Sequence, residues 1–171
     1  MFELTPSGSG WTESIIYRFQ PATDGIGPEA GLILDSAGNL YGSTTCGGPG
    51  GGGVIFELTP FNGSWTFNVL HSFTANCATG PRAELLMDRS GNLYGTTYGG
   101  GNFAFGSVFK LTPGSGGWTY TSLHDFSDGS DGARPESRLV FDASGNLYGT
   151  ASEGGTGCYP IGCGVVFEIT P

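Results

Sequence analysis

Three aspartates recur at one position of the sequence and are the first candidates for acid–base chemistry or cation binding. Asp35, Asp88 and Asp142 each open the same nine-residue stretch, Asp-x-x-Gly-Asn-Leu-Tyr-Gly-Ser/Thr. A glycosidase needs two carboxyl groups in different environments, and equivalent repeat positions do not provide that difference. An aspartate that opens a turn accepts hydrogen bonds from the amides that follow it. We therefore interpret all three as turn residues, with a catalytic or metal-binding carboxylate ring as the alternative.

A second group of carboxylates lies close together along the chain. Asp125, Asp128 and Asp131 occur within eight residues that also contain two glycines. A flexible loop with several oxygen ligands suits Ca²⁺. The corresponding loops 22–25 and 74–77 do not repeat the cluster, so we favour a solvated acidic loop, with a weak Ca²⁺ site as the alternative. No other metal or cofactor is expected.

Three tryptophans begin the same type of segment in successive copies of a repeat. They are Trp11, Trp65 and Trp118, and each is followed by threonine. An exposed indole can stack on a sugar ring, but packing is the commoner use because the ring buries a large apolar area. We favour packing and keep Trp65 and Trp118 as candidate ligand residues.

Charged side chains vary between the copies at the start of one apolar segment. Glu84 and Arg138 stand where the first copy has Gly31. Because the copies differ most here, we include both residues in any small-ligand site. The rim of that site is expected to contain Glu29, Arg82 and Glu136.

Two histidines occupy a position that is tyrosine in the first copy. His71 and His124 align with Tyr17. A catalytic histidine needs a partner that orients it, and the exchange for tyrosine favours packing instead.

A repeat positions all of these residues. Asn39, Asn92 and Asn146 lie 53 and 54 residues apart, a period typical of repeat architectures. Each copy of about 54 residues contains short strand-like segments between Gly-rich turns, and no segment shows helical spacing of apolar residues. In the second copy the segments are residues 85–88, 92–97, 107–112 and 118–126. Four strands per repeat predict an all-β fold of three antiparallel propeller blades, with a β-helix as the less favoured alternative.

The first two segments of each copy form a tight hairpin. The run Leu85-Leu86-Met87 is apolar at every position, which predicts burial on both faces. The Gly-Asn pair in the turn predicts left-handed backbone. The glycine after the tyrosine leaves room for close approach by a neighbouring unit.

The four cysteines predict two disulfides. Cys46 follows the second strand of one blade and Cys77 precedes the first strand of the next; loops of these two types emerge on the same face of a propeller. Cys158 and Cys163 lie in one loop and can close a small ring. Free thiols and, less favoured, a metal site are the alternatives. Disulfides indicate an oxidising compartment, so we expect an extracellular or cell-surface protein.

The repeats resemble the GloVer-type tandem repeats of secreted bacterial proteins. That pattern, Gly-Leu-Ile-x-Asp-x-x-Gly-Asn-Leu-Tyr-Gly-Thr followed by glycines and Val-Phe-Lys-Leu-Thr-Pro, occurs three times. The matching residues are 31–43 with 51–60, 85–97 with 99–113, and 139–150 with 164–171. The resemblance implies a propeller-like repeat in surface or exported proteins, and it implies no catalytic residues.

The strand count is irregular at both ends of what we expect to be one repeat domain, residues 1–171. Residues 1–20 contain only the third and fourth strands of a blade, 21–74 and 75–127 contain all four, and 128–171 lack the fourth. Three blades are fewer than the roughly 4–8 of known propellers. Open ends would also expose apolar faces and unpaired strand edges.

We therefore expect other copies of the chain to complete the ends. Two chains would give six blades, three would give nine, and a contact that does not close would give a filament. Because Phe2–Pro6 duplicates Phe167–Pro171, the two segments compete for one place, which favours strand exchange. The expected assembly residues are Phe2, Leu4, Trp11, Ile15, Phe19, Val166, Phe167 and Ile169.

Charge and hydropathy exclude several partners. The formal net charge is −9 with only six Lys and Arg residues, so no basic face is available for nucleic acid or an acidic membrane. No apolar run approaches the roughly 18 residues of a membrane-spanning helix, and residues 1–20 lack a signal-peptide pattern. Met1 stands where other copies carry isoleucine or valine, which indicates a segment cut from a longer protein or an engineered start.

The expected function is a non-catalytic extracellular scaffold that self-assembles through complementary terminal strands. The alternative is a lectin-like propeller module that binds carbohydrate or peptide. A propeller-type glycoside hydrolase ranks third.

Overall fold

The computed structural model describes residues 1–74, 76–158 and 160–170, and these residues form strands and no helices. The N-terminal hairpin is a two-stranded sheet of β1 (Phe2–Ser7) and β2 (Gly10–Ile15). The first four-stranded sheet contains β3 (Ile33–Leu34), β4 (Leu40–Ser43), β5 (Gly51–Phe61) and β6 (Ser64–Thr74), in that order. The second contains β7 (Leu86–Met87), β8 (Leu93–Thr97), β9 (Ser107–Gly114) and β10 (Gly117–Asp125). Every pairing in these sheets is antiparallel, which confirms the predicted all-β class of four-stranded antiparallel sheets.

The third sheet contains a strand that the repeat pattern does not predict. Its strands are β11 (Ala133–Pro135), β12 (Val140–Phe141), β13 (Leu147–Glu153) and β14 (Val165–Ile169). Both β11 and β12 pair with the same strand, β13, whose other neighbour is β14. The left-handed backbone of Gly132 and Arg134, with φ of 98° and 57°, brings β11 alongside β13. The sheet is therefore four-stranded although it has no counterpart of β6 and β10.

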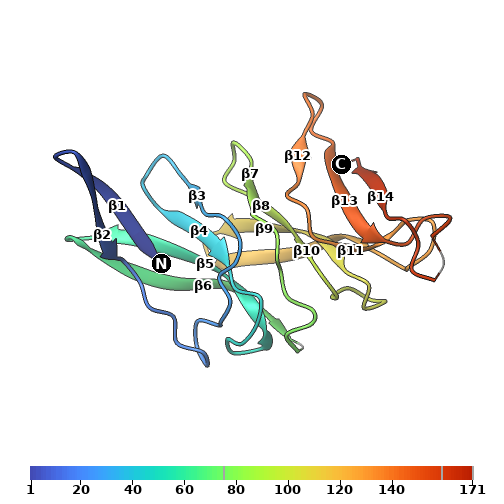
Figure 1. The fold of residues 1–171 in the computed structure, drawn as a ribbon, viewed down its shortest axis with the longest axis horizontal. Coiled ribbons are helices and arrows are strands. Elements are labelled where there is room, and N and C mark those ends of the chain that lie inside the picture. The colour runs from blue at the N-terminus through green and yellow to red at the C-terminus, as the bar shows by residue number, and fades with distance from the viewer. Residues whose placement is uncertain (75, 159, 171) are drawn as a thin grey trace.

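The sheets follow one another along the longest axis of the molecule. The β1–β2 hairpin lies at one end and β14 lies at the other, so the two termini are far apart (Figure 1). Residues 1–74, 76–158 and 160–170 thus form an open row of blade-like sheets, and no closed ring occurs among them.

The core lies in the seams between the sheets. The seam between the first and second sheets is filled by buried Tyr41, Ile55, Leu85, Leu93, Phe109 and Leu111. The seam between the second and third is filled by Tyr94, Val108, Phe126, Leu139, Leu147 and Ala151. In the middle sheet, both β7 residues are half-buried. Leu34 of β3 and Val140 of β12 are instead 67% and 55% exposed, because no neighbouring sheet covers them, so the predicted burial of this segment on both faces fails at the ends.

The repeated aspartate holds each hairpin turn in the same way. One carboxylate oxygen of Asp88 accepts hydrogen bonds from the backbone amides of Ser90 and Asn92 at 2.8 and 2.9 Å. The other accepts from the Asn92 side-chain amide at 2.7 Å and from the Tyr94 hydroxyl at 3.1 Å. Burial opposes ionisation, but these donors outweigh it and lower the pKa of Asp88. The same bonds recur at Asp35 and Asp142.

Two glycines of the repeat have roles that differ in part from those predicted. Gly91 has a left-handed φ of 79°, whereas Asn92 does not, so glycine alone supplies the left-handed turn and asparagine supplies the bond to the aspartate. A Cβ on Gly95 would lie 2.7 Å from the Phe109 ring and 3.0 Å from Leu85. The close approach therefore comes from the same sheet rather than from a neighbouring unit.

Removing the turn carboxylate should destabilise the fold. We expect Asp88→Ala to lower the free energy of unfolding by about 1–3 kcal/mol, because two backbone amides lose a charged acceptor. Urea denaturation followed by tryptophan fluorescence measures this change. Ser90→Ala is the control, since it keeps the backbone amide that donates to Asp88, and equal effects of the two variants would contradict the prediction.

Candidate assembly interface

The outer edge of β14 is the first candidate contact surface. In the first two sheets, β5 and β9 are paired along both edges. Among the described residues β14 pairs with β13 alone. Val166 is 79% exposed, whereas its counterparts Ile55 and Val108 are 0% exposed. Such an edge offers free backbone donors and acceptors to another strand.

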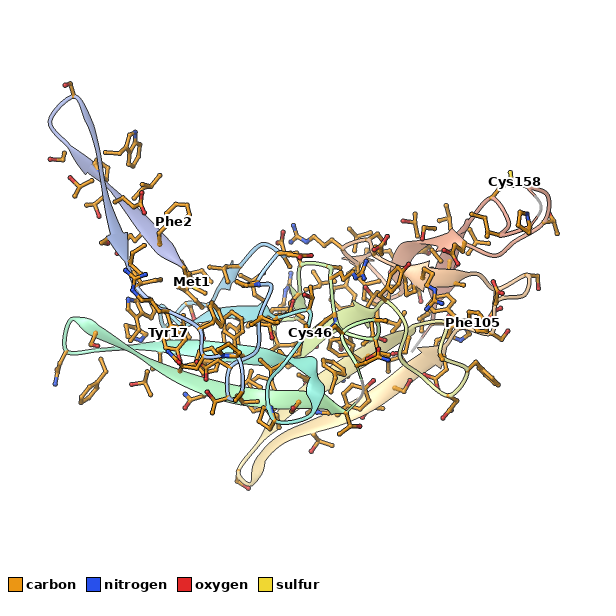
Figure 2. All side chains as sticks on the ribbon, turned by 60° about the horizontal axis from the view of Figure 1, so that its bottom comes forward. Met1, Phe2, Tyr17, Cys46, Phe105 and Cys158 are labelled. Atoms are coloured by element: carbon orange, nitrogen blue, oxygen red, sulfur yellow. A yellow bond between two sulfur atoms is a disulfide. The ribbon has the colours of Figure 1, made fainter. Side chains whose placement is uncertain are left out.

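The β1–β2 hairpin is the second candidate contact surface. Its register pairs Phe2 with Ile15, Leu4 with Glu13, and Pro6 with Trp11. The β5–β6 pair has the same register at the corresponding residues, Phe56 with Val69, Leu58 with Phe67 and Pro60 with Trp65. The hairpin thus corresponds to the outer half of a blade. All its residues are exposed, including Phe2 at 59% and Trp11 at 68%, and Figure 2 shows it projecting from the body of the molecule.

The chain crosses from each sheet to the next through a pair of aromatic residues. In the first crossing, Tyr17 stacks on Phe67 with ring centroids 4.7 Å apart, and Phe19 packs edge-on against Phe56 at 5.3 Å. In the second crossing, His71 stacks on Tyr120 at 4.4 Å. The Phe19–Phe56 contact has counterparts in the other two crossings. Phe73 packs against Phe109 with ring centroids 5.6 Å apart, and Phe126 packs against Phe167 at 5.0 Å.

The third crossing lacks the stacking partner. His124 is the counterpart of His71, but the strand that would carry a ring beside it is missing from the third sheet. Its Nε2 atom instead lies 3.2 Å from the Asp131 carboxylate.

The hydrogen bonding and burial of the crossing residues Tyr17 and His71 suit structural roles. The Tyr17 hydroxyl donates to Asp24 at 2.7 Å. Burial, together with this hydrogen bond to a carboxylate, raises the pKa of Tyr17 to about 12. Burial also lowers the pKa of His71, so its stacked ring is neutral near pH 7.

Two of the three carboxylates of the acidic loop are engaged within the protein. Asp131 accepts from the backbone amide and the hydroxyl of Ser127, and Asp125 accepts from Ser122 at 2.7 Å. The described part of the chain contains no group of three or more acidic, histidine or cysteine side chains arranged to hold a metal ion. No additional observation points to Ca²⁺ at Asp128.

The charged residues expected at a ligand site form ion pairs between neighbouring sheets. Arg82 and Glu136 lie 3.0 Å apart, and Arg138 and Glu84 lie 3.2 Å apart. Glu84 also lies against Gly31, where a Cβ would be 2.7 Å from its carboxylate. Half-exposed pairs of this kind contribute about 0–1 kcal/mol each, so their main effect is to match the charges of adjacent repeats.

The three tryptophans have different environments. Trp118 packs edge-on against Tyr41 of the preceding sheet, with centroids 6.3 Å apart. Trp65 packs against the buried residues of the first sheet. Trp118 also lines a cavity of about 580 Å³ whose polar lining includes Asp35, Asp88 and Arg89.

One interaction in the seam between the second and third sheets could not be predicted from the sequence. Two guanidinium groups lie over the Tyr98 ring, with Arg82 Cζ at 3.8 Å and Arg134 Cζ at 4.9 Å from its centroid. The other copies have Thr45 and Ser152 at the position of Tyr98, so the repeat pattern does not reveal this stack.

Both predicted disulfides are present. Cys46 and Cys77 join the loop after β4 to the segment that leads to the second sheet, and Cys158 and Cys163 close a small ring near the C-terminal end. Figure 2 places Cys46 in the centre of the molecule and Cys158 at its edge.

Loss of the Cys46–Cys77 bridge should destabilise the protein more than loss of the other. The bridge closes 31 residues, so we expect the double serine variant to lose about 3–4 kcal/mol of unfolding free energy. The Cys158/Cys163 double serine variant is the matched control, with an expected loss of about 2 kcal/mol because its loop is short. Denaturant unfolding of both variants measures the difference, and the reverse order would contradict the prediction.

Comparison with known proteins identifies a repeat family. The sequence model described as the Gloeobacter/Verrucomicrobia repeat matches residues 1–171, which confirms the resemblance based on the Asp-x-x-Gly-Asn-Leu-Tyr-Gly motif. A search of curated proteins finds no match. Across the described ranges, no helix has the length and apolarity needed to cross a bilayer.

Proposed function

Since the chain belongs to the Gloeobacter/Verrucomicrobia repeat family over residues 1–171, we propose that it is a non-catalytic extracellular scaffold that self-assembles through its terminal strands. The β1–β2 hairpin of one copy supplies the strand that the third sheet of another copy lacks. One observation carries the proposal: every residue of this hairpin is exposed, whereas the equivalent β5 and β9 are largely buried within sheets. An isolated two-stranded hairpin is marginally stable at best in water.

Sequence identity between the two ends supports strand exchange. Residues Phe167-Glu168-Ile169 of β14 repeat Phe2-Glu3-Leu4 of β1 with one change. Strand β2 can therefore leave β1 and pair with β14 of another copy while keeping nearly the same partners. Exchange of equivalent elements is a low-cost route to oligomers. Following the register of β1–β2, Ser14 would lie opposite Glu168.

Each added chain contributes three sheets to the assembly. Two copies would form a six-bladed ring and three a nine-bladed ring, while a contact that does not close would form a filament. The two disulfides support an extracellular location, because such bonds persist in oxidising compartments.

Light scattering tests the assembly directly. We expect the 171-residue chain to show two or three times the mass of one 17.6 kDa chain, or a polymer. Mixing chains carrying Ser14→Cys with chains carrying Glu168→Cys should give a covalent dimer on oxidation, because cross-strand Cα atoms lie about 4.5–5.5 Å apart.

A matched control uses Ser7→Cys in place of Ser14→Cys, since Ser7 lies on the displaced strand and should not cross-link to position 168. A single-chain mass at every concentration, with no specific cross-link, would refute the proposed assembly.

Carbohydrate binding is a second candidate, favoured by the cavity beside Trp118. Its lining combines an aromatic ring with the polar side chains of Asp35, Asp88 and Arg89, and these groups suit stacking on and hydrogen bonding to a sugar ring. A glycan array should then show repeated hits that Trp118→Ala abolishes and the exposed-residue control Phe103→Ala retains. Absence of hits, or equal binding by both variants, would remove this candidate.

A further inference from the structure

We propose that the seam between the second and third sheets contains a preformed site for an indole ring, and that Trp11 of a second copy occupies it. This inference rests on the proposed self-assembly and names the side chain that anchors it.

The site is an apolar cavity of about 210 Å³. Tyr94 lies on one side, and Lys110 Nζ lies 5.5 Å from the centroid of its ring. The apolar lining consists of Leu123, Phe141, Leu147 and Ile169. Lys110 also lines the cavity, so a second ring placed there can meet the same ammonium group, which is attracted to the face of a ring.

The seam between the first and second sheets shows which side chain occupies the equivalent position. There, Trp118 packs edge-on against Tyr41, with an interplanar angle of 65°, and joins a cluster that contains Leu93 and Leu111. Tyr94, Leu147 and Ile169 are the counterparts of Tyr41, Leu93 and Leu111 in the next repeat. Within residues 1–74, 76–158 and 160–170 the third sheet has no strand equivalent to β10, so no tryptophan of this chain occupies that place.

Strand β2 carries the matching residue in the matching register. Trp11 lies opposite Pro6 in the hairpin, just as Trp118 lies opposite Pro113 in the second sheet. Its side chain is 68% exposed in the single chain. Pairing of β2 with β14 of another copy therefore brings the indole to the open cavity.

The residue two positions after Trp11 also suits a second copy as the occupant, because its carboxylate can accept a hydrogen bond. Phe67 and Tyr120, two residues after their tryptophans, stack on Tyr17 and His71. In β2 the residue at this position is Glu13. In the assembled seam Glu13 therefore faces His124, whose ring already contacts Asp131 and Phe126. A carboxylate thus meets the crossing histidine that has no stacked ring beside it among the described residues.

Sedimentation of the full chain at varied concentration tests the site. We expect Trp11→Ala to weaken self-association roughly 30-fold or more, as loss of a buried aromatic anchor does. Leu123→Trp should weaken it similarly by filling the cavity from within. The control is Phe61→Ala, which removes another ring that is 66% exposed and should leave association unchanged.

Free indole at millimolar concentration probes the cavity in the wild-type chain. This test therefore does not depend on whether a cavity variant folds. Indole should weaken association of the wild-type chain and leave that of Trp11→Ala unchanged. Weakening by Trp11→Ala, together with competition by indole, supports the site.

Assembly that is insensitive to Trp11→Ala overturns this inference and leaves the proposed function standing, and so does sensitivity to Trp11→Ala without competition by indole. A chain that stays monomeric at every concentration overturns both.

Discussion

Each sheet of this protein can bury its apolar residues only against the sheet beside it. Strands β3, β7 and β12 are each only two residues long, and the buried clusters lie in the seams rather than within any one sheet. The aromatic pairs at the crossings, such as His71 on Tyr120, fix the spacing of these seams. Stability in such a row is a sum of neighbour contacts, so the terminal repeats are the ones that need covering.

This constraint explains why residues that suggest chemistry have structural partners. The aspartates bind the donors of their own turns, and their equivalent environments give no division into acid and base. Glu84 and Arg138 pair with each other across a seam. Among the described residues, the outer edge of β14 and the β1–β2 hairpin have no neighbouring strand or sheet over them, and the proposed function starts from those two places.

The sequence predicts most of the fold because its local signals repeat in register. The repeated motif predicts the turn at Asp88, and the order of the strands predicts the bridge between Cys46 and Cys77. Strand β11 could not be predicted, because it depends on left-handed backbone at Arg134, a residue type that rarely adopts it. The cavity beside Tyr94 could not either, since it results from a missing side chain, and the Tyr98 stack depends on distances between sheets that no pattern encodes.

The position of the Cys46–Cys77 bond determines how the row would carry tension. A pull between the two ends reaches residue 46, passes through the sulfur atoms and leaves at residue 77, so the backbone of β5 and β6 between them is bypassed. The second seam has no covalent shortcut, and its ion pairs and packed rings must resist the force themselves. Under stretching, the third sheet would therefore separate while the β5–β6 hairpin stays intact.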